Sequence, residues 1–372
     1  MQIKIDPEQI KDLKKRIEAE ATTGLMGLGG PAGLITEGFF QLVKYTDKIS
    51  KTFVLGQPHI LLKGGTGIGK TDLCQSAAAA IKGKFSRISC TPDMMPYDLL
   101  GGQVLVENRK GERRVQFKPG PLFANIVLLD EANRAQPKTM SAVLEAMEER
   151  SVSPRTEYID DDEQVVGTLP LFPISGEYGD FKSPLFFMVL MTENIFGEEE
   201  GTYPTPMGVL DRATFTVSIL RPSFEDEKRI RADQIVGKSI KEVADLKEIL
   251  ACADWIFHHV EFSEAAYHYR TLLIRNTDPD PKINEPNSEI GQHLSAYVRV
   301  GDSPRANLHL EAVARTHAFF AGSMVVKPEH IKAVAKSVLM HRLVLKPGKE
   351  FKTTKEEVFE KILKMTGQPE WK

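Results

Sequence analysis

Hydrophobic and polar residues are arranged differently on the two sides of residue 221. Between residues 59 and 220, helical segments alternate with short apolar runs, which read HILLK, FSRIS, IVLLD, LFFMVLMT and FTVSI. Runs of this kind are typical of buried strands in a mostly parallel sheet with helices on both faces. From Arg221–Pro222 onward the pattern is helical and almost without strand signal, so an all-helical domain is expected there. The helices expected in it span about 223–235, 239–259, 263–276, 304–321, 328–342 and 354–366.

The N-terminal segment has a pattern of its own. Residues 7–22 carry apolar side chains on one face of an amphipathic helix, and the Gly-rich run at 24–34 predicts a flexible joint or loop. The sequence therefore divides into an N-terminal helix with its joint (1–35), an α/β core (36–221) and a helical domain (222–372).

Composition and charge narrow the class of protein. The 372 residues are 41% hydrophobic and 27% charged, an ordinary globular mixture, and the net charge of -3 gives no general attraction to nucleic acid or anionic membrane. Three widely spaced cysteines fit reduced thiols in a cytoplasmic protein. The charged N-terminus has no apolar signal region, and no apolar run approaches the length of a transmembrane helix. We therefore expect a cytoplasmic protein without a membrane span.

The run HILLKGGTGIGKTDL, which begins at His59, carries the first chemical motif. Its residues 64–71 fit G-x-x-x-x-G-K-[ST] between a predicted strand and an Ala-rich predicted helix. Glycines let backbone N–H groups turn toward phosphate oxygens, and the helix N-terminus adds its dipole. We expect Lys70 to reach the β- and γ-phosphates and the Thr71 hydroxyl to bind Mg²⁺. The candidate nucleotide-binding residues are Gly64, Gly65, Thr66, Gly67, Ile68, Gly69, Lys70, Thr71 and Asp72.

The second motif, IVLLDEANR at 126–134, ends a predicted buried strand with two carboxylates. Beside a phosphate loop, Asp130 is expected to hold Mg²⁺ and Glu131 to polarise a water for attack on the γ-phosphate. An Asp-Glu pair after a strand is also common as a helix N-cap. Together with the phosphate loop, however, it supplies the carboxylate that a metal–nucleotide site needs, so the two motifs favour a site that cleaves the γ-phosphate of a bound nucleotide.

Three longer segments, at 120–153, 186–215 and 301–343, resemble the MoxR family of AAA+ ATPases in order and spacing. The resemblance extends over roughly residues 36–345. It implies an α/β AAA+ core, with a mostly parallel sheet flanked by helices, and a C-terminal all-α lid domain. It also implies a ring-forming ATPase that uses ATP and Mg²⁺ to remodel or mature other proteins, or to insert a metal or cofactor into them.

The resemblance also implies roles for three further residues. Asn194 stands at the sensor-1 position, where an amide can hold the attacking water or the γ-phosphate. Arg212 matches the arginine finger, whose planar guanidinium suits the charge of the transferring phosphoryl group on a neighbouring subunit. Arg305 matches sensor 2 at the start of a lid helix, and the sequence leaves open whether it acts on its own subunit's nucleotide or on the neighbour's.

Two insertions stand out within this pattern. Residues 101–118 fit an insert within the second helix of the core, a hairpin that turns at 109–111. Residues 155–184 predict an enlarged hairpin that faces a central pore or, equally, a surface-loop extension.

The resemblance implies partners as well. We expect a homo-oligomeric ring, a hexamer, that works with a separate von Willebrand A-type protein and a client protein. A magnesium-chelatase-type motor subunit, whose ATPase core is much alike, is one alternative. A nucleic-acid-dependent motor is another, supported only by the basic run RKGERR at 109–114, which is more typical of a solvated hairpin tip.

Overall fold

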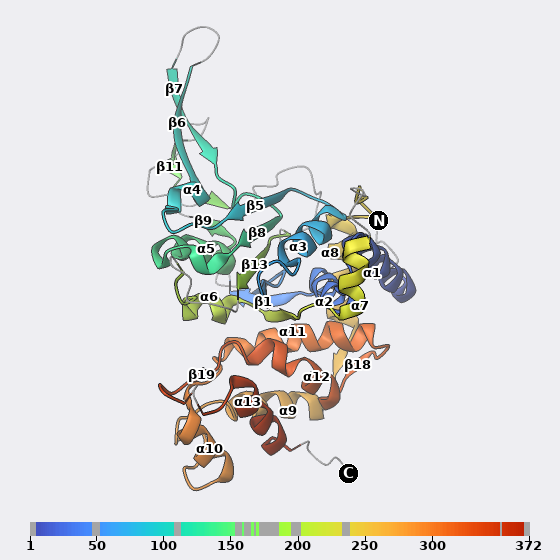
Figure 1. Cartoon of the computed structure of the whole chain (residues 1–372), viewed down its shortest axis with the longest axis vertical. Helices are drawn as coiled ribbons and strands as arrows, with labels where there is room; N and C mark the ends of the chain where they lie inside the picture. The colour runs from blue at the N-terminus through green and yellow to red at the C-terminus, as the bar shows by residue number, and fades with distance from the viewer. Residues whose placement is uncertain are drawn as a thin grey trace.

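A five-stranded parallel sheet forms the centre of the molecule (Figure 1). The computed structural model describes residues 5–46, 53–107, 113–152, 158–159, 165–166, 169–170, 186–194, 202–232, 239–349 and 352–367. The strands lie in the order β14-β3-β13-β8-β5, and each neighbouring pair is parallel. Their bounds, in that order, are Phe215–Ile219, Ile60–Gly64, Met188–Asn194, Ile126–Asp130 and Phe85–Ser89. Each strand overlaps one of the five apolar runs, with β3 and β13 extending one and two residues beyond theirs, so the predicted parallel sheet is confirmed.

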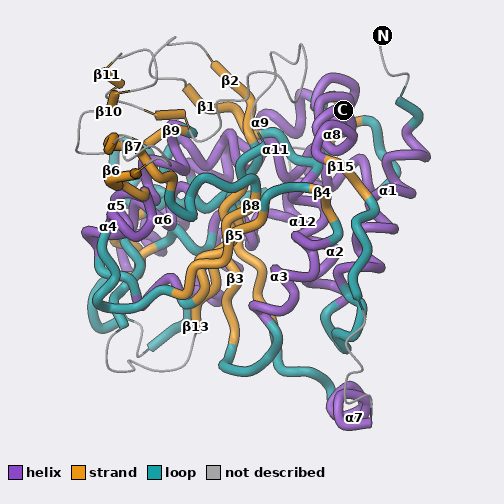
Figure 2. Tube along the Cα trace, turned by 90° about the horizontal axis from the view of Figure 1, so that it is seen from above, coloured by secondary structure: helices purple, strands orange, loops and turns teal. Residues whose placement is uncertain are grey.

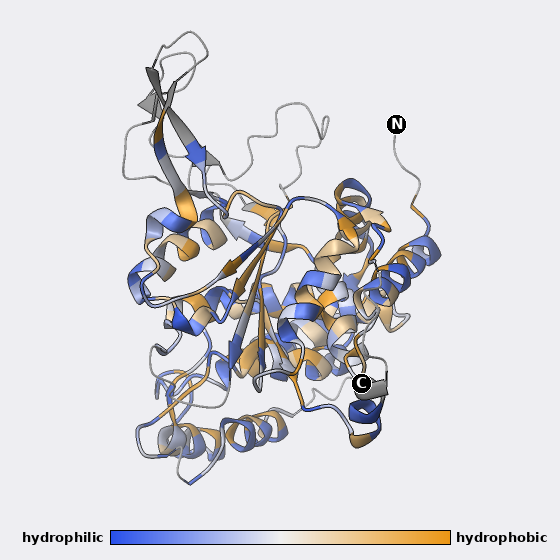
Figure 3. Cartoon of the chain, turned by 45° about the horizontal axis from the view of Figure 1, so that its top comes forward, coloured by the Kyte–Doolittle hydropathy of each residue, from blue (hydrophilic) through white to orange (hydrophobic). Residues whose placement is uncertain are grey.

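Helices cover both faces of the sheet (Figures 2 and 3). Successive side chains of the strands point to opposite faces, and the side chains on both faces are buried. Leu62, Leu128 and Leu190 pack on one side with helices α1, α2 and α3. Leu61 and Val127 pack on the other side with α4, α5 and α6. Helix bounds are α1 Pro7–Ala21, α2 Gly29–Phe39, α3 Lys70–Ala79, α4 Pro96–Leu100, α5 Pro137–Glu149 and α6 Met207–Arg212. Burial on two sides explains why the strands are apolar throughout rather than alternating.

The N-terminal region forms two helices that are part of this core. Helix α1 begins after Asp6, whose side chain accepts a hydrogen bond from Glu8 N at 3.0 Å, and its apolar face is buried as expected. Helix α2 corrects the sequence analysis, because residues 29–34 are helical and not part of a joint. At Gly38 helix α2 lies close to the sheet: a Cβ there would lie 2.7 Å from Ile60 Cδ1, so a larger residue would require the end of the Ile60 side chain to shift.

The insert expected at 101–118 is a hairpin that projects from the body (Figure 1). Strand β6 (Gly101–Glu107) pairs antiparallel with β7 (Arg113–Pro119), while the predicted turn and the side chains of the basic run at 109–114 lie outside the described residues. Of the expected hairpin at 155–184, only short antiparallel pairs are described. These pairs are β9 (Ser151–Val152) with β12 (Leu169–Pro170) and β10 (Tyr158–Ile159) with β11 (Val165–Val166).

The C-terminal part is mainly helical; α9 to α13 lie beneath the sheet in Figure 1, whereas α7 and α8 are seen on the right at the height of the sheet. Its helices are α7 Phe224–Ala232, α8 Leu246–His259, α9 Glu264–Arg275, α10 Glu289–Tyr297, α11 Arg305–Phe320, α12 Pro328–Leu339 and α13 Lys355–Met365. Helix α10 was not predicted, and the helix expected from 239 begins only at Leu246. The reason is that Ala244–Asp245 (β15) pairs with Ile81–Lys82 (β4), and the Asp245 side chain then caps α8.

Small pairs of strands complete the fold. They are β1 (Val43–Thr46) with β2 (Phe53–Gly56), β16 (Glu261–Phe262) with β18 (Val325–Val326), and β17 (Val298–Val300) with β19 (Val344–Leu345). Helices α11 and α12 pack against α2 and β14, so the lid shares one hydrophobic cluster with the core. The three cysteines are free and buried. Within the described ranges, no helix is long and apolar enough to cross a bilayer.

Candidate functional site

The loop between β3 and α3 has the backbone conformation of an anion cradle. Gly67 and Gly69 have φ angles of 73° and 83°, in the left-handed region that glycine adopts without steric cost. Helix α3 begins after Gly69, and among the described residues no side chain caps its N-terminus. The first N–H groups of α3 can therefore bind an anion at the positive end of the helix dipole.

Lys70 reaches back across this loop. Its Nζ lies 3.1 Å from Gly64 O, 2.5 Å from Gly65 O and 2.8 Å from Asn194 Oδ1. Three oxygen acceptors thus surround the ammonium group at the place where the motif expects phosphate oxygens. Burial lowers the pKa of Lys70, and two nearby carboxylates oppose that shift. The side chain is already directed to the place where the terminal phosphates would lie.

Asp130, the last residue of β8, is held by three side chains. Its Oδ1 accepts hydrogen bonds from Thr71 Oγ1 at 2.6 Å and Thr192 Oγ1 at 2.8 Å, and its Oδ2 pairs with Arg87 Nη2 at 2.6 Å. Burial alone would raise the pKa of Asp130, but these hydrogen bonds and the Arg87 charge lower it below the usual value. Asp130 is therefore a carboxylate at neutral pH.

Glu131 adopts a backbone conformation that is rare for a residue other than glycine, with φ at 56°. Its backbone N–H donates to Thr192 Oγ1 at 2.9 Å, which fixes the turn after β8. Its carboxylate accepts hydrogen bonds from Asn194 Nδ2 at 3.3 Å and Arg134 Nη1 at 2.9 Å. The strained turn thus directs the carboxylate toward Asn194 at the end of the neighbouring strand.

These groups line one cavity of about 300 Å³. Its lining consists of residues 66–72, Arg87, Asp130, Glu131, Thr192 and Asn194. Gly64 and Gly65 bind Lys70 through their carbonyls. Sequence reasoning gave Arg87 and Thr192 no role. The sequence offered two signals for them: a charged residue inside the predicted strand FSRIS and a threonine two residues before Asn194. Neither signal shows which strands lie beside β8, and only that placement brings these side chains to Asp130.

Two oxygen donors meet in this cavity in a way that fits Mg²⁺. Thr71 Oγ1 and Asp130 Oδ1 are 2.6 Å apart, and Asp130 is ionised. Magnesium prefers oxygen ligands, commonly one or two protein groups together with water and substrate phosphates. The Thr71 hydroxyl and the Asp130 carboxylate are therefore oxygen ligands of the kind that Mg²⁺ prefers.

Arg212 and Arg305 lie elsewhere, at the amino edge of the sheet. Arg212 ends α6 just before β14, and Thr214 N donates to His59 O at 2.7 Å beside the first residue of β3. Arg305, the first residue of α11, pairs with Asp211 at 2.7 Å. The phosphate loop follows the opposite, carboxyl end of β3, and a strand of five residues spans about 16 Å.

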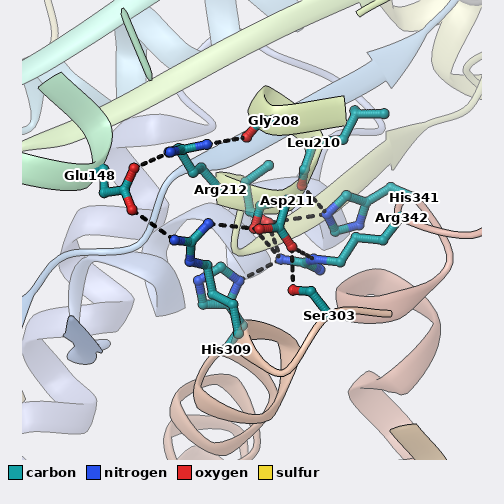
Figure 4. Close-up of polar contacts among 11 residues, drawn as sticks. Glu148, Gly208, Leu210, Asp211, Arg212, Ser303, His309, His341 and Arg342 are labelled. Carbon is teal, nitrogen blue, oxygen red and sulfur yellow. Dashed lines mark hydrogen bonds and ion pairs between the residues drawn. The ribbon is translucent and has the colours of Figure 1, made fainter. Parts of the chain in front are cut away.

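Glu148 joins the two arginines. One of its carboxylate oxygens binds Arg212 Nη2, and the other binds Arg305 Nη2 at 2.8 Å (Figure 4). A second cavity of about 170 Å³ opens beside them, with Arg150 also in its lining. The further lining residues are Val43, Lys44, Tyr45, Gln57, His59, Met147, Thr214, Leu308 and His309. Cationic side chains outnumber Glu148 there, so the cavity favours an anion.

Two buried histidines, His59 and His309, line the second cavity, and a third, His341, contacts the end of α6. Burial lowers the pKa of His59, His309 and His341 well below 6.5. Nearby arginines act in the same direction, Arg150 on His59 and Arg342 on the other two. All three imidazoles are therefore neutral in the folded chain at neutral pH.

Acidification below about pH 6.5 is expected to lower the free energy of unfolding, because the histidines of the unfolded chain bind protons that these buried histidines do not. Each histidine contributes a slope of up to about 1.4 kcal/mol per pH unit. Asp302 acts oppositely: burial raises its pKa to about 7, so the folded state takes up a proton as the pH falls. The destabilising effect of the three histidines exceeds the stabilising effect of Asp302, so the net effect of acidification is a loss of stability. Urea unfolding midpoints at about pH 7.5, 6.5 and 5.5 test this; midpoints that stay equal would contradict it.

Two family models match the chain. The model described as "ATPase family associated with various cellular activities (AAA)" matches residues 59–215, which contain the first cavity and Arg212. The model described as an AAA lid domain matches residues 292–362, which contain Arg305.

Individual proteins match over most of the chain. The uncharacterised protein YeaC of Bacillus subtilis is 33% identical over 311 residues, covering 83% of this chain and 84% of that protein. The chaperone MoxR1 of Mycobacterium tuberculosis is 33% identical over 296 residues, covering 78% and 69%. The protein MoxR of Methylorubrum extorquens is 27% identical over 366 residues, covering 92% and 90%. A crystal structure of a putative ATPase from Cytophaga hutchinsonii has a TM-score of 0.75 and 26% identity, covering 98% and 97%.

Proposed function

Because this chain belongs to the MoxR family of AAA+ ATPases, we propose that it hydrolyses ATP at the interfaces of a homo-oligomeric ring and thereby remodels client proteins. ATP binding, ATP hydrolysis and self-assembly are general features of AAA+ ATPases. The division of the site between two subunits is supported by the positions of the two arginines.

The first cavity provides the half of the site that binds the nucleotide. Residues 64–72 bind the phosphates through loop N–H groups and Lys70. Glu131 accepts a proton from the attacking water. Asn194 lies 3.3 Å from the Glu131 carboxylate and 2.8 Å from Lys70 Nζ, and it holds either that water or the γ-phosphate. Thr71 and Asp130 would hold Mg²⁺, which neutralises phosphate charge when bound.

The placement of Arg212 is the observation that carries the proposal. This side chain lies at the amino edge of the sheet, whereas its own subunit's phosphate loop lies at the carboxyl edge. Phosphoryl transfer gains most from a guanidinium that contacts the transferring group directly. Arg212 can therefore contact only a nucleotide that is held by another subunit. In the ring, that subunit would place the phosphates of its nucleotide at the second cavity.

Arg305 belongs to the same half. It shares Glu148 with Arg212 and does not line the nucleotide cavity of its own chain. We therefore assign both arginines to the neighbour's nucleotide. When the phosphates approach, the guanidinium groups give up their hydrogen bonds to the Glu148 and Asp211 carboxylates and form hydrogen bonds to phosphate oxygens. Phosphate oxygens accept bidentate hydrogen bonds as carboxylates do.

Work on a client follows from movement of the lid. Hydrolysis removes the γ-phosphate contacts, which allows the lid angle and the projecting hairpin to change position. A relative of this chain is named a chaperone, which supports remodelling or maturation of other proteins, including insertion of a metal or cofactor, as the outcome. A hexameric ring and a separate von Willebrand A-type partner remain parts of this proposal.

Dilution tests the shared site. ATP turnover per subunit is expected to fall toward zero as the protein is diluted through the ring's dissociation range, because each site loses its arginines. Binding of a fluorescent ATP analogue is the control and should persist, since the phosphate cradle lies within one chain. Turnover that stays constant down to concentrations at which light scattering finds only monomers would overturn the proposal.

A further inference from the structure

The last carbonyls of the helix that carries Arg212 accept hydrogen bonds from outside that helix. Helix α6 has six residues and passes directly into extended backbone at Ala213, without a left-handed cap. The last carbonyls of any helix lack partners within the helix and need them from elsewhere. Here the partners come from the lid (Figure 4).

His341 and Arg342, which follow α12, supply these partners. His341 Nε2 lies 3.1 Å from both Leu210 O and Ala213 O; because carbonyls only accept, Nε2 carries the proton. Arg342 Nη2 donates to Ala213 O at 2.5 Å and to Asp211 O at 3.3 Å. Both side chains are almost fully buried, at 5% and 2% exposure, so water does not compete for these bonds.

The side chain of Asp211, next to Arg212, is held by the lid too. Its oxygens accept hydrogen bonds from Ser303 Oγ at 2.5 Å and Arg305 Nη1 at 2.7 Å, and Arg342 Nε lies 3.8 Å away. Four lid residues thus contact the last turn of α6. A rotation of the lid must either carry α6 with it or break buried hydrogen bonds, each of which is costly to leave unmade.

We propose that His341 and Arg342 are positioning residues for Arg212, so that the lid of each subunit sets the arginine which that subunit gives to its neighbour. Arg305, which we assign to the same neighbouring nucleotide, begins helix α11 of that lid, so a change in the lid would alter both arginines of the neighbour's site together. The inference rests on the interfacial site proposed above.

The test begins with His341→Phe, which keeps a buried ring and removes the donor. We expect kcat to fall about 10- to 100-fold, since misplacement of a catalytic group by about 1 Å can cost 10²-fold, while the KM for ATP and nucleotide binding stay within about twofold. The matched control is His293→Phe. His293 is buried on α10, bonds to Val358 O at 3.2 Å within the lid, and has no contact with α6 among the described residues. Its kcat should be unchanged.

Mixed rings separate a defect in the arginine from a defect in the subunit's own site. His341→Phe subunits mixed with Glu131→Gln subunits should regain turnover, because the latter offer an intact arginine to an intact nucleotide site. Arg212→Ala subunits mixed in the same way calibrate the assay. No regain with Arg212→Ala would refute the interfacial site itself, and the inference with it. Regain with Arg212→Ala but not with His341→Phe would refute the inference alone.

Ser303→Ala keeps the inference open to test if His341→Phe does not fold. Ser303 is only partly buried, and its loss removes one bond to Asp211. A smaller loss of kcat that is restored in mixed rings supports the inference, and a wild-type kcat opposes it.

Discussion

Replacement of Arg212 by alanine is expected to lower ATP turnover by about 10³- to 10⁵-fold, the range known for arginine fingers. In the proposed interfacial site, the guanidinium stabilises charge that develops on the transferring phosphoryl group, so its loss is expected to lower kcat. Nucleotide binding should be retained, because Arg212 does not line the cavity that holds the nucleotide of its own chain. Steady-state ATPase assays at saturating ATP, together with binding of a fluorescent analogue, measure both quantities.

The control for Arg212→Ala is Arg275→Ala, which removes an exposed arginine from α9 that lines neither cavity. Its turnover should match that of the unmodified protein. Light scattering must show that Arg212→Ala still forms rings, since Arg212 also binds Glu148. Near-normal turnover in intact rings would exclude Arg212 from the reaction.

Replacement of Glu131 by glutamine should lower turnover by about 10²- to 10⁴-fold, the usual contribution of a general base. The amide keeps the size of the side chain and can still accept a hydrogen bond from Arg134, but it cannot take a proton from water. The phosphate cradle and Asp130 are unchanged, so ATP should bind with near-normal affinity and remain uncleaved. Rapid-quench measurement of the first turnover shows whether cleavage itself is slowed.

Glu145→Gln on α5 is the matched control for this substitution, because Glu145 lines neither cavity. It should leave the first turnover unchanged. If Glu131→Gln cleaves ATP at the normal rate, another group must take the proton from the water, and Asp130, another carboxylate in the cavity lining, would be tested next.

Local sequence was sufficient to predict the strands, and the proposed nucleotide-binding motifs are contiguous within it. The apolar runs predict strands because a parallel sheet is buried on both faces, and the phosphate loop is a contiguous motif whose glycines fix its own backbone. The failures have physical causes as well. Glycine disfavours helices, yet α2 forms because Ala32, Ile35 and Phe39 are buried and Gly38 permits close approach to the sheet. Helix α10 buries Leu294 but few other apolar side chains, so its periodicity was too weak to detect.

Arg87 and Thr192 show a second kind of limit. Each lies on a different strand from Asp130, and their hydrogen bonds depend on β5 and β13 lying on either side of β8. The order of strands in a sheet is set by packing between distant segments and leaves no local pattern. The same holds for His341 and Arg342, whose partners lie about 130 residues away in sequence.

The sequence by itself determined which chemical motifs this protein carries: a contiguous phosphate loop and a contiguous Asp130–Glu131 pair predict the groups that meet a nucleotide. Only the tertiary structure decided where the arginines lie. Parallel strands place all their carboxyl ends on one edge, so motifs that follow strands gather there, whereas Arg212, which precedes a strand, lies at the other edge. The lid then brings Arg305, His341 and Arg342 to that edge.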